Sequence, residues 1–480
     1  MTGSFGRSAT RIRRGVVVLA GAVLGAGLLL APPAAAATAP GAPGAGSAWT
    51  SGLKQGLGTS TTTTSKVWYT LGNGITDEVF YPQTDTPDVQ DLQYLVTDGS
   101  TFTDNERDNA THTLAMPDPQ SLTYQQVNTA ASGRWRITKT YVTDPARSTL
   151  LIQTRFQVLT GGPLQLYLVF NPSLRGSGMG DTGVTSAGQL VGSDGSVSSA
   201  LAAGPGFAAT TNGYSGTTSD PWSDLTAHHA LTAAYDSAPT PGNLVQAGRI
   251  TVGADTTFTL ALGFGASQAE ASGNASASLT AGWASVAAAY QNGWHSYLAG
   301  LKPVPAAVSS AGQTQLYTIA VMALAADEDK TYRGAFVASL STPWGEAVNA
   351  DNGGVAGYHA VWARDLYQIA TALIADGDTA GAGRALDYLL NVQQKADGSF
   401  PQNSWLNGTP YWGGLQLDEV SFPIILADTL GRTDAATWSK IKKAADFVVA
   451  NGPSTPQERW EENAGYSPAT IAAQIAGLVS

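Results

Sequence analysis

The hydrophobic period of this chain changes near residue 276, and this change constrains the fold more than any other feature of the sequence. Before it, apolar residues alternate with polar ones or run in short stretches that Gly, Asn and Asp interrupt. After it, apolar residues recur at helical spacing. We therefore expect a multidomain β + α chain, with an antiparallel β-sandwich at residues 66–275 followed by helices. The clearest predicted strands lie at 136–142, 150–158, 164–170 and 258–264.

The helical part is predicted to begin with a linker at residues 276–306, which Pro303 and Pro305 end. Aromatic residues form a stripe along this linker, a pattern more typical of packing between domains than of ligand binding. Farther on, Gly-, Trp- and Asn-rich loops such as 402–414 join the helices, and an α/α toroid places its binding site in such loops. Candidate helices lie at 307–326, 361–375, 379–394, 418–430, 434–450 and 468–479.

The composition narrows the classes of partner and chemistry. The 480 residues carry a formal net charge of −11, which argues against nucleic acid and anionic membrane as partners. Hydrophobic residues make up 43% of the chain, enough to build real cores. The chain contains no cysteine, so disulfides and thiolate metal sites are excluded.

The N-terminus has the pattern of an export signal at residues 1–36. A basic stretch with Arg13 and Arg14 precedes the apolar run 15–30, and Ala34–Ala36 supplies small residues for cleavage. The apolar run is short for a membrane span. We therefore expect a secreted, extracellular protein, exported by the general or the twin-arginine route. Residues 37–65, which are rich in Ala, Pro, Gly and Thr, are predicted to be a flexible spacer.

The segment 357–365 is the first candidate for binding chemistry. Arg364 and Asp365 stand at a predicted helix start, where a guanidinium and a carboxylate can fork around neighbouring sugar hydroxyls. Tyr358 and Trp362 offer flat faces for a pyranose ring. An aspartate favoured by the helix dipole beside a surface arginine explains the pair equally well. His359 has no second ligand at metal spacing and is interpreted as structural.

The segment 403–419 is the second candidate. Its tryptophans, Trp405 and Trp412, lie in a Gly-rich loop that suits either stacking on sugar or packing of the loop on its own domain. Asp418 is interpreted as a cap of the following helix.

The segment 457–463 is the third and most informative candidate. Glu461 and Glu462 are adjacent carboxylates behind Trp460, and a carboxyl beside an indole can stay protonated as a general acid for glycoside cleavage. The alternative is a solvated acidic patch. No phosphate loop, dinucleotide fingerprint, zinc spacing or nucleophile elbow is present, so phosphate-binding, redox and triad chemistries lack support.

Several motifs together resemble the bacterial glucoamylases and glucodextranases, inverting exo-α-glucosidases of glycoside hydrolase family 15. The stretches 68–82, 91–99 and 178–183 resemble the start of their N-terminal β-supersandwich. In the helical part, the segments 338–345, Trp362–Asp365 and Arg459–Ser467 fit closely. The resemblance implies an N-terminal sandwich followed by an (α/α)6 toroid, and hydrolysis of α-glucans from their non-reducing ends.

The resemblance also assigns roles to individual residues. Arg364 and Asp365 match the pair that grips the glucosyl unit, and Tyr358 matches a tyrosine beside the catalytic centre. Trp412 matches the loop tryptophan that supports the acid. Glu461 matches the general acid, which protonates the leaving glycosidic oxygen, and Glu462 matches a substrate-binding glutamate.

The number of predicted helices and the absence of a match to the general base depart from the family pattern. The toroid that the resemblance implies has twice as many helices as the six predicted here, so we expect an incomplete toroid at 307–480. No residue matches the general base, so we expect this chain to lack it and to show little activity alone. The chemistry requires no cofactor or metal, although calcium is a candidate ligand at Asp351–Asn352. Alternative functions are a non-catalytic secreted α-glucan-binding protein and a sandwich-plus-toroid glycoside phosphorylase.

Overall fold

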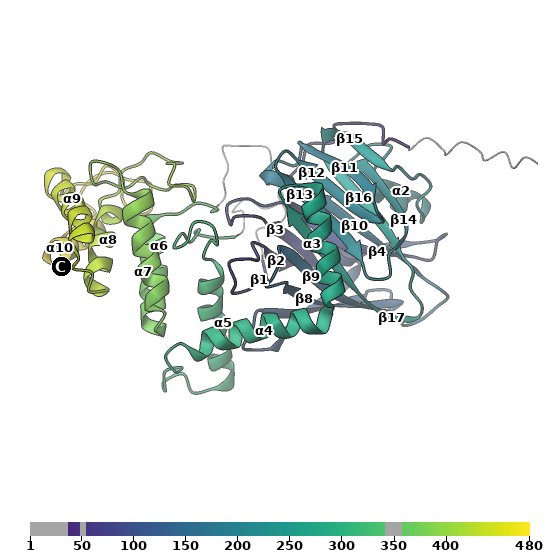
Figure 1. The fold of residues 1–480 in the computed structure, drawn as a ribbon, viewed down its shortest axis with the longest axis horizontal. Helices are drawn as coiled ribbons and strands as arrows, with labels where there is room; N and C mark the ends of the chain where they lie inside the picture. Colours follow the sequence, from purple (N-terminus) through teal and green to yellow (C-terminus); the bar gives the residue numbers. More distant parts are fainter. Residues whose placement is uncertain (1–36, 49–53, 341–357) are drawn as a thin grey trace, which may run out of the picture. The chain divides into compact units, whose positions relative to one another are not determined.

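The structure is a computed structural model that describes residues 37–48, 54–340 and 358–480 (Figure 1). The predicted export signal, the end of the 338–345 motif and the candidate calcium loop at Asp351–Asn352 lie outside the described residues.

The first half of the described chain forms two antiparallel sheets. Along the first sheet the strands follow the order β1 (Gly56–Gly58), β2 (Trp68–Gly72), β3 (Ile75–Phe80), β4 (Val89–Thr97), β10 (Gln165–Pro172), β16 (Leu244–Ile250) and β14 (Phe207–Tyr214), and β5 (Thr103–Asn105) pairs with β4. The second sheet has the order β15 (Ser237–Gly242), β11 (Asp181–Ser186), β12 (Gln189–Asp194), β13 (Val197–Ala203), β17 (Asp255–Gly265), β9 (Thr149–Val158), β8 (Trp135–Thr143), β7 (Thr123–Ala130) and β6 (Ala110–Asp118). Short helices α1 (Glu106–Asn109) and α2 (Pro221–His228) interrupt the strands.

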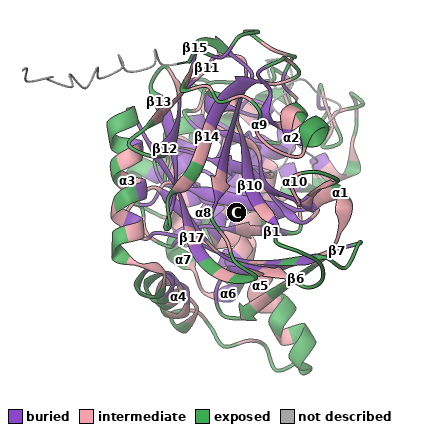
Figure 2. Cartoon of the chain, turned by 90° about the vertical axis from the view of Figure 1, so that its right-hand side faces the viewer, coloured by how far each residue is buried: buried purple, intermediate pink, exposed green. Residues whose placement is uncertain are grey.

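Side-chain alternation explains why these strands form a sandwich. On β8, Trp135, Ile137 and Tyr141 are fully buried, while the residues between them at the start of the strand face outward. One core of buried apolar residues contains side chains from both sheets, and Figure 2 shows buried residues concentrated on the strands. The predicted β-sandwich is therefore confirmed, and its strands coincide with the predicted ones to within a few residues.

The described parts of the stretch 37–65, which are residues 37–48 and 54–65, differ from the flexible spacer that the sequence predicts. Thr38 forms a parallel bridge with Ser237, and β1 pairs with β2. The side chains of Thr59, Ser60 and Ser65 are buried. Low complexity hid these contacts, because small residues with no apolar period can still fill the edge of a core.

Two helices, rather than one linker helix, follow the sandwich. They are α3 (Gln268–Ala281) and α4 (Trp283–Ala299), which meet at Gly282. Helix α3 packs closely on β17, where a Cβ at Gly263 would lie 2.5 Å from the carbonyl oxygen of Ala271. The aromatic stripe of α4 packs as predicted, because Tyr290 and Trp294 are buried and the Trp294 indole donates to the carbonyl oxygen of Thr59 at 2.9 Å.

The remaining described helices match the six predicted ones, with ends shifted by a few residues. They are α5 (Ala311–Ala326), α6 (Ala363–Asp376), α7 (Thr379–Tyr388), α8 (Leu417–Thr429), α9 (Ala435–Asn451) and α10 (Pro468–Val479), and a π-helical turn at Leu389–Gln393 continues α7. A second apolar core joins α6, α7, α8 and α9 and includes Trp68 and Phe80 from the sandwich strands. The Trp68 indole donates to the carbonyl oxygen of Ala326 at the end of α5 (2.8 Å).

Candidate active site

The first turn of α6 presents three of the predicted site residues. Trp362 occupies the N-cap position and makes no side-chain cap, so its indole is available for other contacts. Arg364 and Asp365 follow in the first turn. Backbone hydrogen bonds between Val361 and Ser404, at 2.8 and 3.0 Å, fasten the start of this helix to the loop that carries Trp412.

Arg364 lies at the centre of the site, with its side chain 19% exposed. Its Nη1 donates to Oε1 of Gln416 at 2.5 Å and lies 3.7 Å from Oε1 of Glu419. Its Nη2 lies 3.3 Å from Oδ2 of Asp365 and 3.8 Å from Oε1 of Glu461. One guanidinium therefore contacts carboxylates from α6, from α8 and from the loop before α10.

Glu461 carries its carboxyl group into this cluster. Its Oε1 accepts a hydrogen bond from the Trp362 indole at 2.9 Å and another from Nε2 of Gln416 at 3.4 Å. The backbone of Glu461 has a φ of 68°, in the left-handed region that residues other than glycine rarely adopt. Strained backbone of this kind is concentrated at functional sites, and here it aims the carboxyl at Trp362.

Burial and charge together keep some of these carboxyl groups protonated. Burial raises the pKa of Glu419 well above its usual range, and the positive charge of Arg364 offsets part of that rise. Burial likewise raises the pKa of Asp365 and of Asp418, again opposed by Arg364. A single guanidinium does not offset the burial of all three groups, so the pKa values of Asp365, Asp418 and Glu419 stay above those of isolated carboxyl groups.

Aromatic rings surround the acidic cluster. Trp362 makes edge contacts with Tyr358 (ring centroids 5.9 Å apart) and with Trp412 (5.8 Å), and Trp412 stacks on Tyr411 at 5.3 Å. Tyr358 is 47% exposed and Trp412 is 37% exposed, so both rings offer a face to solvent. The tryptophan that donates to Glu461 is Trp362, and Trp412 contacts Trp362 edge to face.

Glu462 is exposed and its backbone N–H donates to Glu458, so its role as a substrate contact stays a prediction. Asp418 does not cap α8, because Gln416 holds the N-cap position and Asp418 lies buried in the first turn. His359 has the structural role expected of it, since it is buried against Phe80 and burial lowers its pKa to about 3.

Sequence reasoning missed Gln416, Gln457 and Glu419 as members of the site. No local signal marked Gln416, because the sequence analysis placed the cap of this helix at Asp418 and only the structure shows Gln416 at the N-cap. Among residues 37–48, 54–340 and 358–480, no group of three or more His, Cys, Asp or Glu side chains is arranged to hold a metal ion. In the same ranges, no helix is long and apolar enough to cross a membrane.

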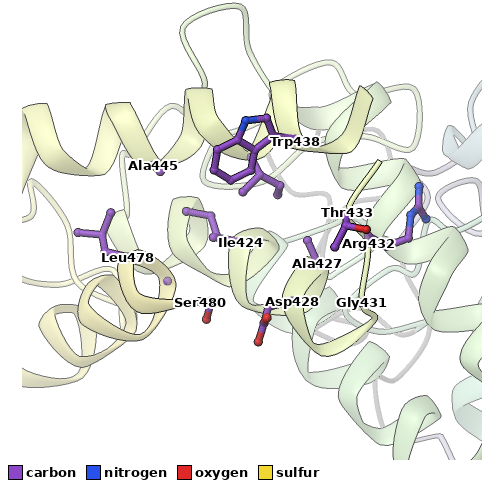
Figure 3. Close-up of a pocket in the computed structure, with 12 residues that line it drawn as sticks. Ile424, Ala427, Asp428, Gly431, Arg432, Thr433, Trp438, Ala445, Leu478 and Ser480 are labelled. Atoms are coloured by element: carbon purple, nitrogen blue, oxygen red, sulfur yellow. The ribbon is translucent and has the colours of Figure 1, made fainter. Parts of the chain in front are cut away.

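A separate cavity of about 330 Å³ lies among α8, α9 and α10. Figure 3 shows Ile424, Trp438 and Leu478 lining it from these three helices, with Asp428 and Arg432 also at its wall. Most of its lining is apolar, and it includes none of the site residues described above. The concentration of charged, hydrogen-bonding and aromatic side chains around Arg364 makes that cluster the better candidate for chemistry.

Comparison with known proteins agrees with this architecture. Residues 39–299 match the family model described as glucodextranase, domain N, and residues 312–480 match that of glycosyl hydrolases family 15. These two matches define the class: a glucodextranase-type β-sandwich followed by a family 15 helical domain. The chain belongs to the bacterial glucoamylase and glucodextranase family.

Individual relatives support the same assignment. A glucoamylase from a Clostridium species is 40% identical over 442 residues, which cover 91% of this chain and 61% of the relative. The crystal structure of a bacterial glucoamylase complexed with acarbose matches with a TM-score of 0.86 and 39% identity, covering 92% of this chain and 64% of that one. An uncharacterized glycosyl hydrolase of Methanocaldococcus jannaschii is 31% identical over 129 residues, 25% of this chain and 21% of the relative. The chain thus spans about three fifths of the length of the glucoamylases it matches.

Proposed function

We propose that the protein is an exo-acting α-glucoside hydrolase that releases glucose from the non-reducing ends of α-glucans. The observation that carries this proposal is the hydrogen bond from the Trp362 indole to Oε1 of Glu461 beside Arg364. The carboxyl group of Glu461 is held between an aromatic and a cationic neighbour, as suits a general acid. The similar bacterial glucoamylase structure contains acarbose, which supports a carbohydrate as the ligand of this site.

In the proposed inverting reaction, each of these residues has a task that the geometry supports. Arg364 donates to, and Asp365 accepts from, the hydroxyl groups of the terminal glucosyl unit, while the exposed faces of Tyr358 and Trp412 pack on the sugar ring. Oε1 of Glu461 already accepts from Trp362 and Gln416, so the acid form carries its proton on Oε2. Glu461 then protonates the glycosidic oxygen as its bond to the anomeric carbon breaks through an oxocarbenium-like transition state. A water molecule adds to the anomeric carbon from the opposite face and gives up a proton. Glu462 serves as an additional substrate contact at the rim of the site.

Secretion completes the proposal. The basic stretch, apolar run and small residues of positions 1–36 support export, and the natural substrate would then be an extracellular α-glucan oligo- or polysaccharide. N-terminal sequencing of the protein recovered from culture medium tests this, with cleavage near Ala36 expected and an intact Met1 contradicting it.

The test of the catalytic role is Glu461→Gln, which keeps the shape of the side chain but cannot supply a proton. The chain is incubated with maltotriose or isomaltotriose, with and without azide, a small anion that attacks the anomeric carbon where no protein base activates water. We expect Glu461→Gln to lower cleavage by about 10²–10⁴-fold, the usual contribution of a general acid. Acarbose binding, measured by calorimetry, should survive the substitution.

Other outcomes would identify the alternatives. Acarbose binding by the unsubstituted chain, with no cleavage even when azide is present, would indicate a non-catalytic glucan-binding protein. Cleavage that depends on inorganic phosphate and yields glucose 1-phosphate would indicate a phosphorylase. Equal cleavage by the Glu461→Gln variant would exclude Glu461 as the acid.

A further inference from the structure

Gln416 connects the two charged groups of the site. Its side chain is almost fully buried, with 1% of the residue exposed. Its Oε1 accepts from Nη1 of Arg364 at 2.5 Å, and its Nε2 donates to Oε1 of Glu461 at 3.4 Å and to Oε1 of Gln457 at 3.3 Å. The amide of Gln416 therefore links Arg364, the proposed sugar-binding arginine, to the carboxyl of Glu461, the proposed general acid.

Gln457 holds the backbone of the acid. Its Nε2 donates to the carbonyl oxygen of Glu461 at 3.1 Å, and its own backbone N–H donates to the carbonyl oxygen of Leu415 at 3.2 Å. Glu461 is the residue with φ of 68°, a conformation that persists only where the surroundings hold it. The Gln457 amide supplies such a restraint, because it donates to the carbonyl oxygen of the strained residue itself.

The start of α8 is built so that Gln416 is free for this task. A residue at an N-cap normally turns its side chain back to the first N–H groups of the helix, and Gln416 does not. The hydroxyl of Thr455 accepts from the N–H of Leu417 at 3.3 Å instead, and it donates to the carbonyl oxygen of Gln457 at 2.8 Å. The capping function has thus passed to the loop that carries the acid.

We propose that Gln416 and Gln457 are positioning residues that fix the carboxyl of Glu461 relative to Arg364. This inference rests on the proposed function, because it assigns the pair to the general acid of that reaction. Gln457 sets the backbone from which the carboxyl projects, and Gln416 sets the distance between that carboxyl and the guanidinium. Loss of either amide lets the acid move away from the glycosidic oxygen while Arg364 still contacts the sugar.

Gly414 offers a way to disturb the pair without changing either glutamine. A Cβ at this position would lie 2.0 Å from Oε1 of Gln457 and 2.5 Å from Oε1 of Gln402, so alanine must displace the Gln457 amide. At the neighbouring Gly413 a Cβ would meet nothing within 4 Å. Gly414→Ala and Gly413→Ala are therefore a matched test and control in the same loop.

The experiment compares Gln416→Met, Gln457→Met and Gly414→Ala with two controls, Gly413→Ala and Gln394→Met. Gln394 is a glutamine that donates to two backbone carbonyls away from the site. The first readout is hydrogen exchange of the peptide 455–465, which needs neither ligand nor turnover. We expect exchange to accelerate about tenfold in the three test variants, the effect of losing one buried hydrogen bond, and to stay unchanged in the controls.

The second readout separates acid placement from general damage. For cleavage of maltotriose in the presence of azide, kcat should fall by about tenfold to a hundredfold in the test variants, since a small misplacement of a catalytic group has this effect. KM should stay within about threefold of the unsubstituted value, because Arg364 still binds sugar. The controls should keep both constants, even where Gln394→Met lowers the melting temperature.

The two readouts keep the possible failures apart. Unchanged exchange in 455–465, or an unchanged kcat, in Gln416→Met and Gln457→Met would overturn the positioning role. If the unsubstituted chain cleaves no glucan even when azide is present, the proposed function fails, and the exchange rates then decide alone whether the pair holds the loop.

Discussion

At the scale of single residues, the buried Lys139 and Glu106 of the sandwich show how a buried ion pair is surrounded by hydrogen-bonding partners. Lys139 of β8 is fully buried, and its Nζ lies 2.8 Å from a carboxylate oxygen of Glu106 and 2.9 Å from the carbonyl oxygen of Gly74. The same carboxylate accepts from the backbone N–H of Tyr94 and from the amide of Asn128. Burial lowers the pKa of Lys139, and the adjacent charge of Glu106 opposes that shift.

This pair gives a prediction with an internal control. Lys139→Met removes one partner and leaves the Glu106 charge buried, so it should lower the free energy of unfolding by about 3–5 kcal/mol. Lys442→Met, which breaks the exposed pair with Asp446 at 2.6 Å, should change it by about 0–1 kcal/mol. Urea denaturation followed by circular dichroism measures both, and equal effects of the two substitutions would contradict the assignment.

The candidate site shows what sequence can and cannot predict at this scale. Arg364, Asp365 and Glu461 stand in recognisable local motifs, and the structure brings them together. The contacts of Gln416 instead come from residues some 40 to 50 positions away in sequence, and no local pattern reports them. The choice of Trp362 over Trp412 as the donor to Glu461 likewise depends on how two loops fold against each other.

At the scale of elements, long helices could be predicted from the sequence more readily than a short strand at the edge of a sheet or a break between two helices. The six helices after residue 306 follow apolar periods, and their ends agree with the predicted ones to within a few residues. Strand β1 has only three residues, Gly56–Gly58, and no period could reveal it. The break between α3 and α4 at Gly282 was missed for a different reason, because the helical composition continues on both sides of it.

The loop 328–336 illustrates how an irregular segment is held against a helix by ion pairs and close backbone contact. The Glu328 carboxylate accepts paired hydrogen bonds from Arg333 and from Arg384 of α7, at 2.7–2.9 Å. Gly334 has a φ of 87°, and a Cβ there would lie 2.0 Å from the carbonyl oxygen of Arg384. Only glycine allows the loop to approach the helix this closely.

Gly334→Ala should therefore destabilise the chain by on the order of 3 kcal/mol, the sum of a left-handed alanine and a displaced backbone. The matched control is Gly383→Ala within α7, where a Cβ would meet nothing within 4 Å. That substitution should stabilise the chain by about 0.5–1 kcal/mol, because alanine favours helix over glycine. Thermal unfolding of both variants checks the prediction, and a stable Gly334→Ala protein would refute the close approach.

At the scale of the whole molecule, family membership and site geometry lead to one account. A glucodextranase-type sandwich precedes a family 15 helical domain, and the loop of that domain that carries Glu461 meets the first turn of α6 at Arg364. Side chains of the sandwich, including Trp68 and Phe80, belong to the core of the helical part. The packing of the sandwich on the helices therefore stabilises the helical part that carries the candidate site.

The central claim is inverting cleavage with Glu461 as the acid, and the anomeric configuration of the first product tests it most directly. Proton NMR follows maltotriose and isomaltotriose incubated with the chain, with and without azide. The account predicts a product of β configuration, either β-glucose or β-glucosyl azide, that disappears in the Glu461→Gln variant. A product of α configuration, or the same β product from the Glu461→Gln variant, would contradict it.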